Sequence, residues 1–260
     1  MTSSGCTRWV EFYWDCHKSV LRFGDFTEEG MKRWIIGSRE AGISPASVNT
    51  RITGINAYLR WSGMSYKLQF LKEPERVLPT LGSPELTKLI RHKPRTWSER
   101  RLHTLVLTLV DTGARIEELL TLSCADTDLE NLLLKLRGKG DKERMVPFSL
   151  ELRKVLYRYR QHHQHELLFC TRDGGRLMRR NVLRDFKRMC KSIEFAAPPR
   201  AIHSLRHTFA TNYIRNGGSV FHLQQALGHS TLDMSRRYAT LLTEDLQKMQ
   251  QRVSVLNRLR

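Results

Sequence analysis

Apolar residues recur at helical spacing through the N-terminal part of the chain. Between residues 48 and 59 they fall on one face of a helix, and Ser44-Pro45 has the residue types of a helix cap and first position. An earlier helical pattern can close at Gly37 or Gly42, because glycine readily adopts the left-handed conformation common at helix ends. The pattern predicts a compact helical module that ends soon after this last helix.

The remainder of the chain combines helical patterns with one β signal. Helical spacing runs over residues 102–110, stops at Asp111-Thr112-Gly113, and runs again from about 115 to 122. Leucines then alternate with other residues at 132–136, a glycine-rich turn follows at 138–141, and residues 144–148 return. This arrangement predicts a β-hairpin. The expected fold class is therefore mainly α with a small antiparallel β-sheet.

Serines mark the starts of three further helices. Ser204 is expected to cap a helix at about 205–215, and Ser219 to cap another that Gly228 closes. Ser230 fits the cap of a last helix in this series.

Two prolines and mixed charge interrupt regular patterning between the helical module and the larger remainder. We predict an all-helical domain at 1–70, a linker at 71–80 and a second domain at 81–242. Residues 243–260 have an amphipathic pattern and are expected to form a terminal helix.

The charge balance favours a polyanionic partner. The 260 residues contain 44 Lys and Arg against 26 Asp and Glu, a formal net charge of +18. Residues 1–78 contain 11 basic and 8 acidic side chains, which leaves 33 and 18 for residues 79–260. Binding to phosphates releases condensed counterions, so we expect the second domain to carry most of the electrostatic attraction.

Cysteine usage and hydropathy indicate an intracellular protein. The five cysteines have no CxxC pairing, which suits reduced thiols in a cytosol. No signal sequence and no apolar run near the ~20 residues of a membrane span are evident. We expect a soluble, cytoplasmic protein with no membrane contact.

Four short segments, at residues 112–119, 138–144, 203–207 and 227–238, carry the candidate chemistry. They read TGARIEEL, GKGDKER, HSLRH and LGHSTLDMSRRY. In their order and spacing they resemble the tyrosine recombinase and integrase family across residues 79–242. The resemblance implies an α+β catalytic domain and a helical core-binding domain that together form a C-shaped DNA clamp. The chain's length suggests a simple, Xer-like type without an arm-binding domain.

Two arginines in these segments suit a phosphodiester. The phosphate is anionic, and attack on it adds charge to its non-bridging oxygens. Planar guanidinium groups match that charge with paired hydrogen bonds, so Arg115 and Arg206 are predicted to clamp the phosphate.

The resemblance assigns roles to the histidines and to one acid. It implies that His203 assists proton transfer or contacts the phosphate, and that His229 donates a hydrogen bond to it. His207 either supports the site or is a structural residue. Glu118 is similar to the family's supporting acid and is expected to orient an arginine or a histidine.

Lys139 and Tyr238 complete the predicted site. Lys139, favoured over Lys142 by its place in the motif, resembles the hairpin lysine that protonates the leaving 5′ oxygen. Tyr238 is the predicted nucleophile, and neighbouring cations and a base would assist its ionisation. Attack would form a 3′-phosphotyrosyl bond that keeps the phosphodiester energy, so rejoining is expected to need no cofactor, neither ATP nor a metal.

The leading hypothesis is site-specific recombination of double-stranded DNA. The resemblance implies inverted-repeat sites and a homotetramer on paired sites, with a monomer or dimer off DNA. It also leaves open whether the terminal helix packs on its own domain or on a neighbouring subunit. One alternative is a topoisomerase of the type IB kind. Another is a non-catalytic DNA-binding regulator, because residues 219–239 imitate a helix-turn-helix.

Overall fold

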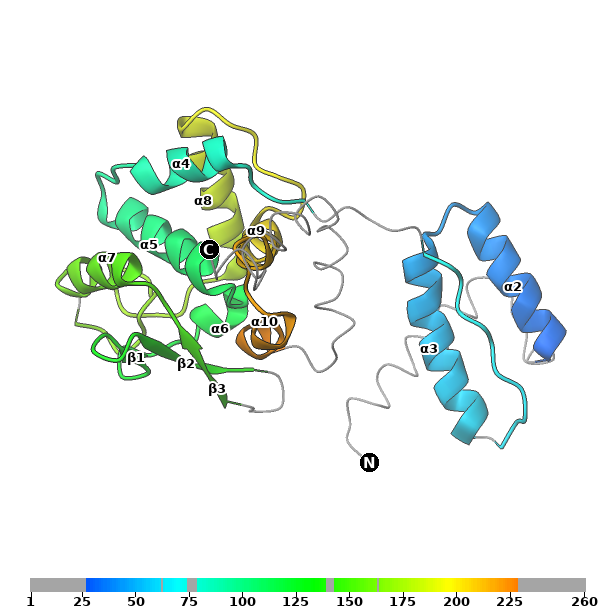
Figure 1. Ribbon diagram of the computed structural model, residues 1–260. Coiled ribbons are helices and arrows are strands. Elements are labelled where there is room, and N and C mark those ends of the chain that lie inside the picture. Colours follow the sequence, from blue (N-terminus) through cyan, green and yellow to red (C-terminus); the bar gives the residue numbers. More distant parts are fainter. Residues whose placement is uncertain (1–26, 62, 74–78, 139–142, 163, 229–260) are drawn as a thin grey trace, which may run out of the picture. The chain divides into compact units, whose positions relative to one another are not determined.

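The structure is a computed structural model that describes residues 27–61, 63–73, 79–138, 143–162 and 164–228. The chain divides into two compact units, Met1–Val77 and Leu78–Arg260. Figure 1 labels the helices and strands of both units.

The N-terminal unit contains helices α2 (Glu28–Glu40) and α3 (Pro45–Trp61). Thr27 caps α2 by accepting a hydrogen bond from Gly30 N, and the helix continues through Gly37. Gly42, at φ +79°, follows its end, so the second of the two predicted closures is the observed one. The predicted start of α3 at Ser44-Pro45 is confirmed, since Ser47 N donates to Ser44 Oγ at 3.3 Å.

An extended segment after α3 runs back beside that helix (Figure 1). The Asn56 side chain donates to Leu68 O at 2.9 Å and accepts from Leu68 N at 2.8 Å. Asn49 makes the same pair of bonds with Leu71, and its Nδ2 also donates to Glu73 Oε1. These amides satisfy backbone groups that have no strand partner. Leu71 and Glu73, which the sequence places in the linker, therefore bond to the helical unit.

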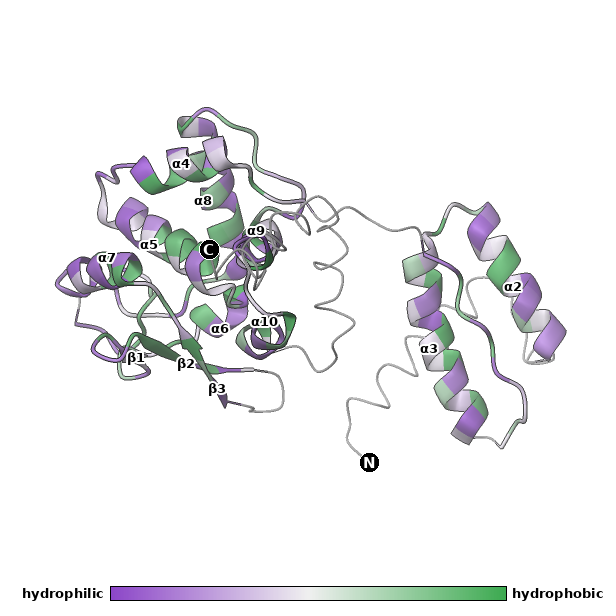
Figure 2. Ribbon diagram, in the orientation of Figure 1, coloured by the Kyte–Doolittle hydropathy of each residue, from purple (hydrophilic) through white to green (hydrophobic). Residues whose placement is uncertain are grey.

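The C-terminal unit is built around α5 (Trp97–Thr112), which contacts several other helices. A capping box between Thr96 and Glu99 begins α5, and Gly113, at φ +63°, ends it where the sequence predicted a stop. Figure 2 shows hydrophobic and hydrophilic residues on each helix, as expected of helices that cover a shared core. The helices that contact α5 include α4 (Ser83–Arg91), α7 (Leu150–Arg160), α8 (Arg179–Ser192) and α9 (Ala201–Arg215).

The β signal corresponds to a three-stranded antiparallel sheet in the order β1-β2-β3. Its strands are β1 (Thr127–Asp128), β2 (Leu133–Arg137) and β3 (Glu143–Pro147). The predicted hairpin and the predicted fold class are confirmed. Leu134 and Leu136 are fully buried beneath the sheet, and Arg144 pairs in register with Leu136. The sequence did not indicate β1, because two residues are too few for an alternating pattern.

Two helix predictions need correction. The helix expected from about 115 to 122 is a single turn, α6 (Ile116–Leu119). The helix expected after Ser204 already begins at Ala201, with Arg200 at its cap in the left-handed conformation (φ +57°). Ser204 therefore lies inside α9, where its hydroxyl donates to Pro199 O at 2.7 Å. A serine that bonds backwards to a carbonyl is compatible with a helix interior, which its residue type alone does not reveal.

The prediction for the next helix is correct. Ser219 caps α10 (Val220–Leu227) by accepting from Phe221 N, and Gly228 ends it at φ +62°. The helix expected after Ser230 lies outside the described residues. Among the helices that are described, none has the length and apolar character needed to cross a membrane.

Gly113 offers a test of the packing between α5, α9 and α10. A Cβ there would lie 2.2 Å from Phe209 Cδ1 and 2.9 Å from Leu227 Cδ2, at a left-handed φ. Gly113→Ala should lower the free energy of unfolding by about 3 kcal/mol, which combines a backbone cost and an overpacking cost. Urea denaturation measures the change. Gly217→Ala is the matched control, because Gly217 is also left-handed but has no atom within 4 Å of that Cβ, and it should lose only about 1 kcal/mol. Equal losses would contradict the packing argument.

Candidate active site

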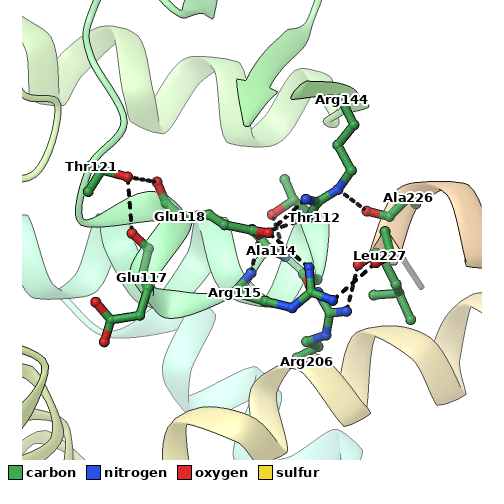
Figure 3. Close-up of polar contacts among 12 residues, drawn as sticks. Thr112, Ala114, Arg115, Glu117, Glu118, Thr121, Arg144, Arg206, Ala226 and Leu227 are labelled. Carbon is green, nitrogen blue, oxygen red and sulfur yellow. Dashed lines mark hydrogen bonds and ion pairs between the residues drawn. The ribbon is translucent and has the colours of Figure 1, made fainter. Parts of the chain in front are cut away.

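The predicted phosphate-binding arginines come from different elements and meet at the end of α10. Arg115 occupies the cap position of α6, just after α5 ends, and Arg206 lies one turn into α9. Figure 3 shows their side chains converging with that of Arg144 from β3. The structure thus brings together residues that lie 91 positions apart in the sequence (206 − 115).

All three guanidinium groups donate to carbonyls at the C-terminus of α10. These carbonyls have no partner within the helix and carry the negative end of its dipole, so cations stabilise them. The pairs are Arg144 Nε to Ala226 O at 3.1 Å, Arg206 Nη2 to Leu227 O at 2.7 Å, and Arg115 Nη2 to Gly228 O at 3.1 Å. Arg206 is buried, and its Nη1 also donates to Gly113 O at 2.6 Å. The end of α10 is consequently bonded to α6, β3 and α9 at once.

Glu118 is the shared acceptor of two of these arginines. Arg144 donates to both carboxylate oxygens at 2.7 Å, and Arg115 donates from Nη1 at 2.9 Å and from its backbone N at 2.8 Å. Burial by itself acts to raise the pKa of Glu118, but the hydrogen bonds from Arg144 and Arg115 outweigh it. The pKa of this buried carboxyl is therefore below its usual value, and Glu118 holds the Arg115 side chain through a hydrogen bond.

Close contact at the end of α10 depends on a glycine. A Cβ on Gly228 would lie 3.1 Å from the guanidinium carbon of Arg144, and the residue has φ +62°. A larger residue would press on that guanidinium and would also strain the backbone.

The two histidines of α9 are held in their neutral forms. Arg179 Nη2 lies 2.8 Å from His203 Nε2, and because a guanidinium only donates, that nitrogen accepts and the ring proton is on Nδ1. Burial, followed by the charges of Arg179, Arg200 and Arg206, lowers the pKa of His203. Burial, followed by the charges of His203, Arg206 and Arg200, lowers the pKa of His207 to about 4. Both rings therefore lack a charge at neutral pH.

The remaining predicted site residues, Lys139, His229 and Tyr238, lie outside the described residues. Gly228, whose carbonyl Arg115 binds, directly precedes His229 in the sequence. One residue of the cluster was missed by sequence reasoning. Arg144 closes the GKGDKER segment, and its side chain is only 15% exposed. The signal that could have found it is an arginine at an inward position of a half-buried strand.

Comparison with known proteins identifies the family. A model of the phage integrase family matches residues 80–245. The chain belongs to the phage integrase family. It is 31% identical over 245 residues to the tyrosine recombinase XerA of Thermococcus kodakarensis, covering 91% of this chain and 85% of that protein. It is 27% identical to the tyrosine recombinase XerC of Chlamydia trachomatis, covering 84% and 74%.

Comparison with a solved structure also shows an integrase fold. The Tn1549 transposon integrase in complex with transposon right end DNA superposes with a TM-score of 0.75 at 19% identity, covering 95% of both chains. Because the chain belongs to this family and matches tyrosine recombinases over most of its length, it is a tyrosine recombinase, an enzyme of site-specific DNA recombination. The recombinase thus has the family and the fold that its four sequence segments predicted.

The neutral state of His207 predicts a pH dependence of the recombinase's stability. In the unfolded chain a histidine binds a proton near pH ~6.5, whereas His207 in the folded chain does so only near pH 4. Stability is therefore lost as pH falls from ~6.5 toward 4, because the unfolded state binds more protons in this window. His207→Asn should reduce the difference in unfolding free energy between pH 7 and pH 5, measured by urea denaturation. His222→Asn, on the exposed side of α10, should leave that difference unchanged. An unchanged difference in His207→Asn would contradict the assignment.

Proposed function

We propose that this recombinase cleaves and rejoins DNA strands through a covalent 3′-phosphotyrosyl intermediate, with Tyr238 as the nucleophile. The observation that carries the proposal is the convergence of Arg115 and Arg206 on the end of α10. In the sequence, His229 follows Leu227, the last residue of α10, by two positions (229 − 227), and Tyr238 follows it by eleven (238 − 227). The segment that holds the proposed nucleophile therefore starts at the arginine cluster.

The cluster has the charge that a scissile phosphate requires. Arg115, Arg144 and Arg206 are accompanied by a single carboxylate, that of Glu118, in the contacts described for this cluster. The Arg115 side chain is 42% exposed, so part of it is accessible to DNA. In the proposed mechanism Arg115 and Arg206 bind the non-bridging oxygens and stabilise the charge that builds up on them during attack.

The chemical step is a transesterification. The Tyr238 oxygen attacks phosphorus, the bond from phosphorus to the 5′ oxygen breaks, and a 3′-phosphotyrosyl bond and a free 5′ hydroxyl result. Lys139 supplies the proton to the leaving oxygen, and His229 donates a hydrogen bond to the phosphate. The phenolic proton of Tyr238 passes to His203, which is neutral and is supported by His207. Rejoining is the reverse reaction with a new 5′ hydroxyl, which requires no external energy source.

The proposed partner is double-stranded DNA with inverted-repeat sites, bound by a homotetramer on paired sites. The net charge of +18 supports attraction to DNA, and relatives of this fold have been solved with DNA bound. In this proposal the domains at 1–70 and 81–242 close around the duplex, and residues 243–260 pack in cis or on a neighbouring subunit. Action on chromosomal DNA would place the protein in the cytoplasm with the nucleoid.

A nicked suicide duplex that carries the cognate site tests the nucleophile. After cleavage the short strand diffuses away and the covalent adduct accumulates. We expect an adduct that survives denaturation and forms in the presence of EDTA, detected as a shifted band on a denaturing gel. Tyr238→Phe should form none, whereas Tyr157→Phe, an exposed tyrosine on α7, should behave as the parent. An adduct with Tyr238→Phe would overturn the assignment of the nucleophile.

The same preparation separates the recombinase from a type IB topoisomerase. Strand exchange between two specific sites supports recombination. Relaxation of any supercoiled plasmid without exchange would favour the topoisomerase, and failure of the parent to form an adduct under any condition would overturn the enzymatic mechanism.

Arg115→Lys tests the phosphate clamp. An ammonium group cannot reproduce the planar fork of a guanidinium, so adduct formation should slow about 100-fold while DNA affinity changes little. Single-turnover cleavage and a fluorescence binding assay measure the two quantities. Arg158→Lys, an exposed arginine on α7, is the control and should leave both unchanged. Parent-like cleavage by Arg115→Lys would remove Arg115 from the site.

A further inference from the structure

Arg144 connects three elements of the cluster through one side chain. It extends from β3, binds both carboxylate oxygens of Glu118 on α6, and donates its Nε to Ala226 O on α10. The side chain is 15% exposed, whereas the basic side chains of Lys135 and Arg137 on β2 are 38% and 57% exposed and pair with Glu143. Arg144 is thus the inward-facing cation among those described on β2 and β3.

The contacts of Arg144 determine the orientation of the Glu118 carboxylate that Arg115 binds. Oε1 of Glu118 accepts from Arg144 Nη1 at 2.7 Å and from Arg115 Nη1 at 2.9 Å, so one oxygen lies between two guanidinium groups. Oε2 accepts from Arg144 Nη2 and from the Arg115 backbone N. The paired bonds from Arg144 fix the plane of the carboxylate, because a fork-to-fork contact allows only one orientation. Arg115 then binds a carboxylate whose position is already set.

We infer that Arg144 is a positioning residue, which holds Arg115 through Glu118 and holds the end of α10 through Ala226. In this role it would keep the phosphate-binding arginine and the segment that leads to the nucleophile in one arrangement. The inference deepens the proposed function and rests on it. It does not require Arg144 to touch DNA.

Removal of Arg144 would leave a buried carboxylate with a single cationic partner. The charged groups that face Glu118 are Arg144 from β3 and Arg115 from its own helix. In the contacts described, α10 contributes only backbone carbonyls to this cluster. Arg206 of α9 donates to two carbonyls, Gly113 O and Leu227 O. Without the two bonds from Arg144, burial is opposed by the bonds from Arg115 alone, so the pKa of Glu118 should be higher in the variant than in the parent. A protonated Glu118 no longer attracts the Arg115 guanidinium as an anion does.

Arg144→Met tests the inference, because it keeps an unbranched apolar stem and removes every donor. Covalent adduct formation on the suicide duplex would be measured in single turnovers from pH 5 to pH 8, with the full chain at saturating concentration. We expect DNA affinity within about twofold of the parent. We expect the rate to fall further below the parent's as pH decreases, because protonation of Glu118 becomes more favourable. The ratio of parent to variant rates should therefore be larger at pH 5 than at pH 8.

Three further variants show that the effect passes through Glu118. Arg144→Met combined with Glu118→Gln has no titrating carboxyl, so its deficit relative to the parent should not grow as pH falls. Arg144→Lys retains one cation at Glu118 and should give rates between those of the parent and Arg144→Met. Arg176→Met is the matched control, because Arg176 pairs at 3.3 Å with Glu117, the neighbouring but exposed glutamate of α6. It should match the parent at every pH.

The outcomes separate the inference from the function on which it rests. A deficit of the same factor at all pH values, or one that persists with unchanged pH dependence in the double variant, would overturn the role of Arg144. Should Arg144→Met fail to fold by circular dichroism, the comparison of Arg144→Lys with the parent decides, and an unchanged rate overturns the inference. A parent that forms no adduct would overturn the proposed function, and the inference with it.

Discussion

The site of this recombinase depends on the bonding of three guanidinium groups to the carbonyl end of α10. Each arginine comes from a different element, and each binds a different carbonyl among Ala226, Leu227 and Gly228. A helix C-terminus attracts cations because its last carbonyls lack partners and share the negative end of the dipole. The same contacts therefore join the elements of the unit and concentrate positive charge where the proposed chemistry needs it.

This concentration of cations requires a counter-charge inside the protein. Glu118 supplies it, since it is buried and accepts from both Arg115 and Arg144. A buried carboxylate is unfavourable unless several donors surround it, and here four donated hydrogen bonds meet that need. The pKa values of the α9 histidines are lowered as well, by burial and then by nearby charges that include Arg206, which favours their neutral forms. Arginines near each group thus favour the ionised form of Glu118 and the neutral forms of His203 and His207.

Sequence patterns predicted the elements that have a local cause. The hairpin followed from alternating leucines, the end of α5 from Gly113, and both ends of α10 from Ser219 and Gly228. Patterns failed where the element is very short or where a serine is not used as a cap. Strand β1 has two residues, α6 has one turn, and α9 starts at Ala201, before Ser204, whose hydroxyl bonds backwards to Pro199 O.

The sequence by itself determined the family and the residue types of the chemistry, because a motif records which side chains are present and in what order. It also indicated Arg115, Arg206 and Glu118 as parts of one site, which the structure brings together. Only the tertiary structure decided that Arg144 belongs with them and that all three arginines meet at α10. Those facts depend on contacts between segments up to 113 positions apart, and no local pattern in the chain encodes such a distance.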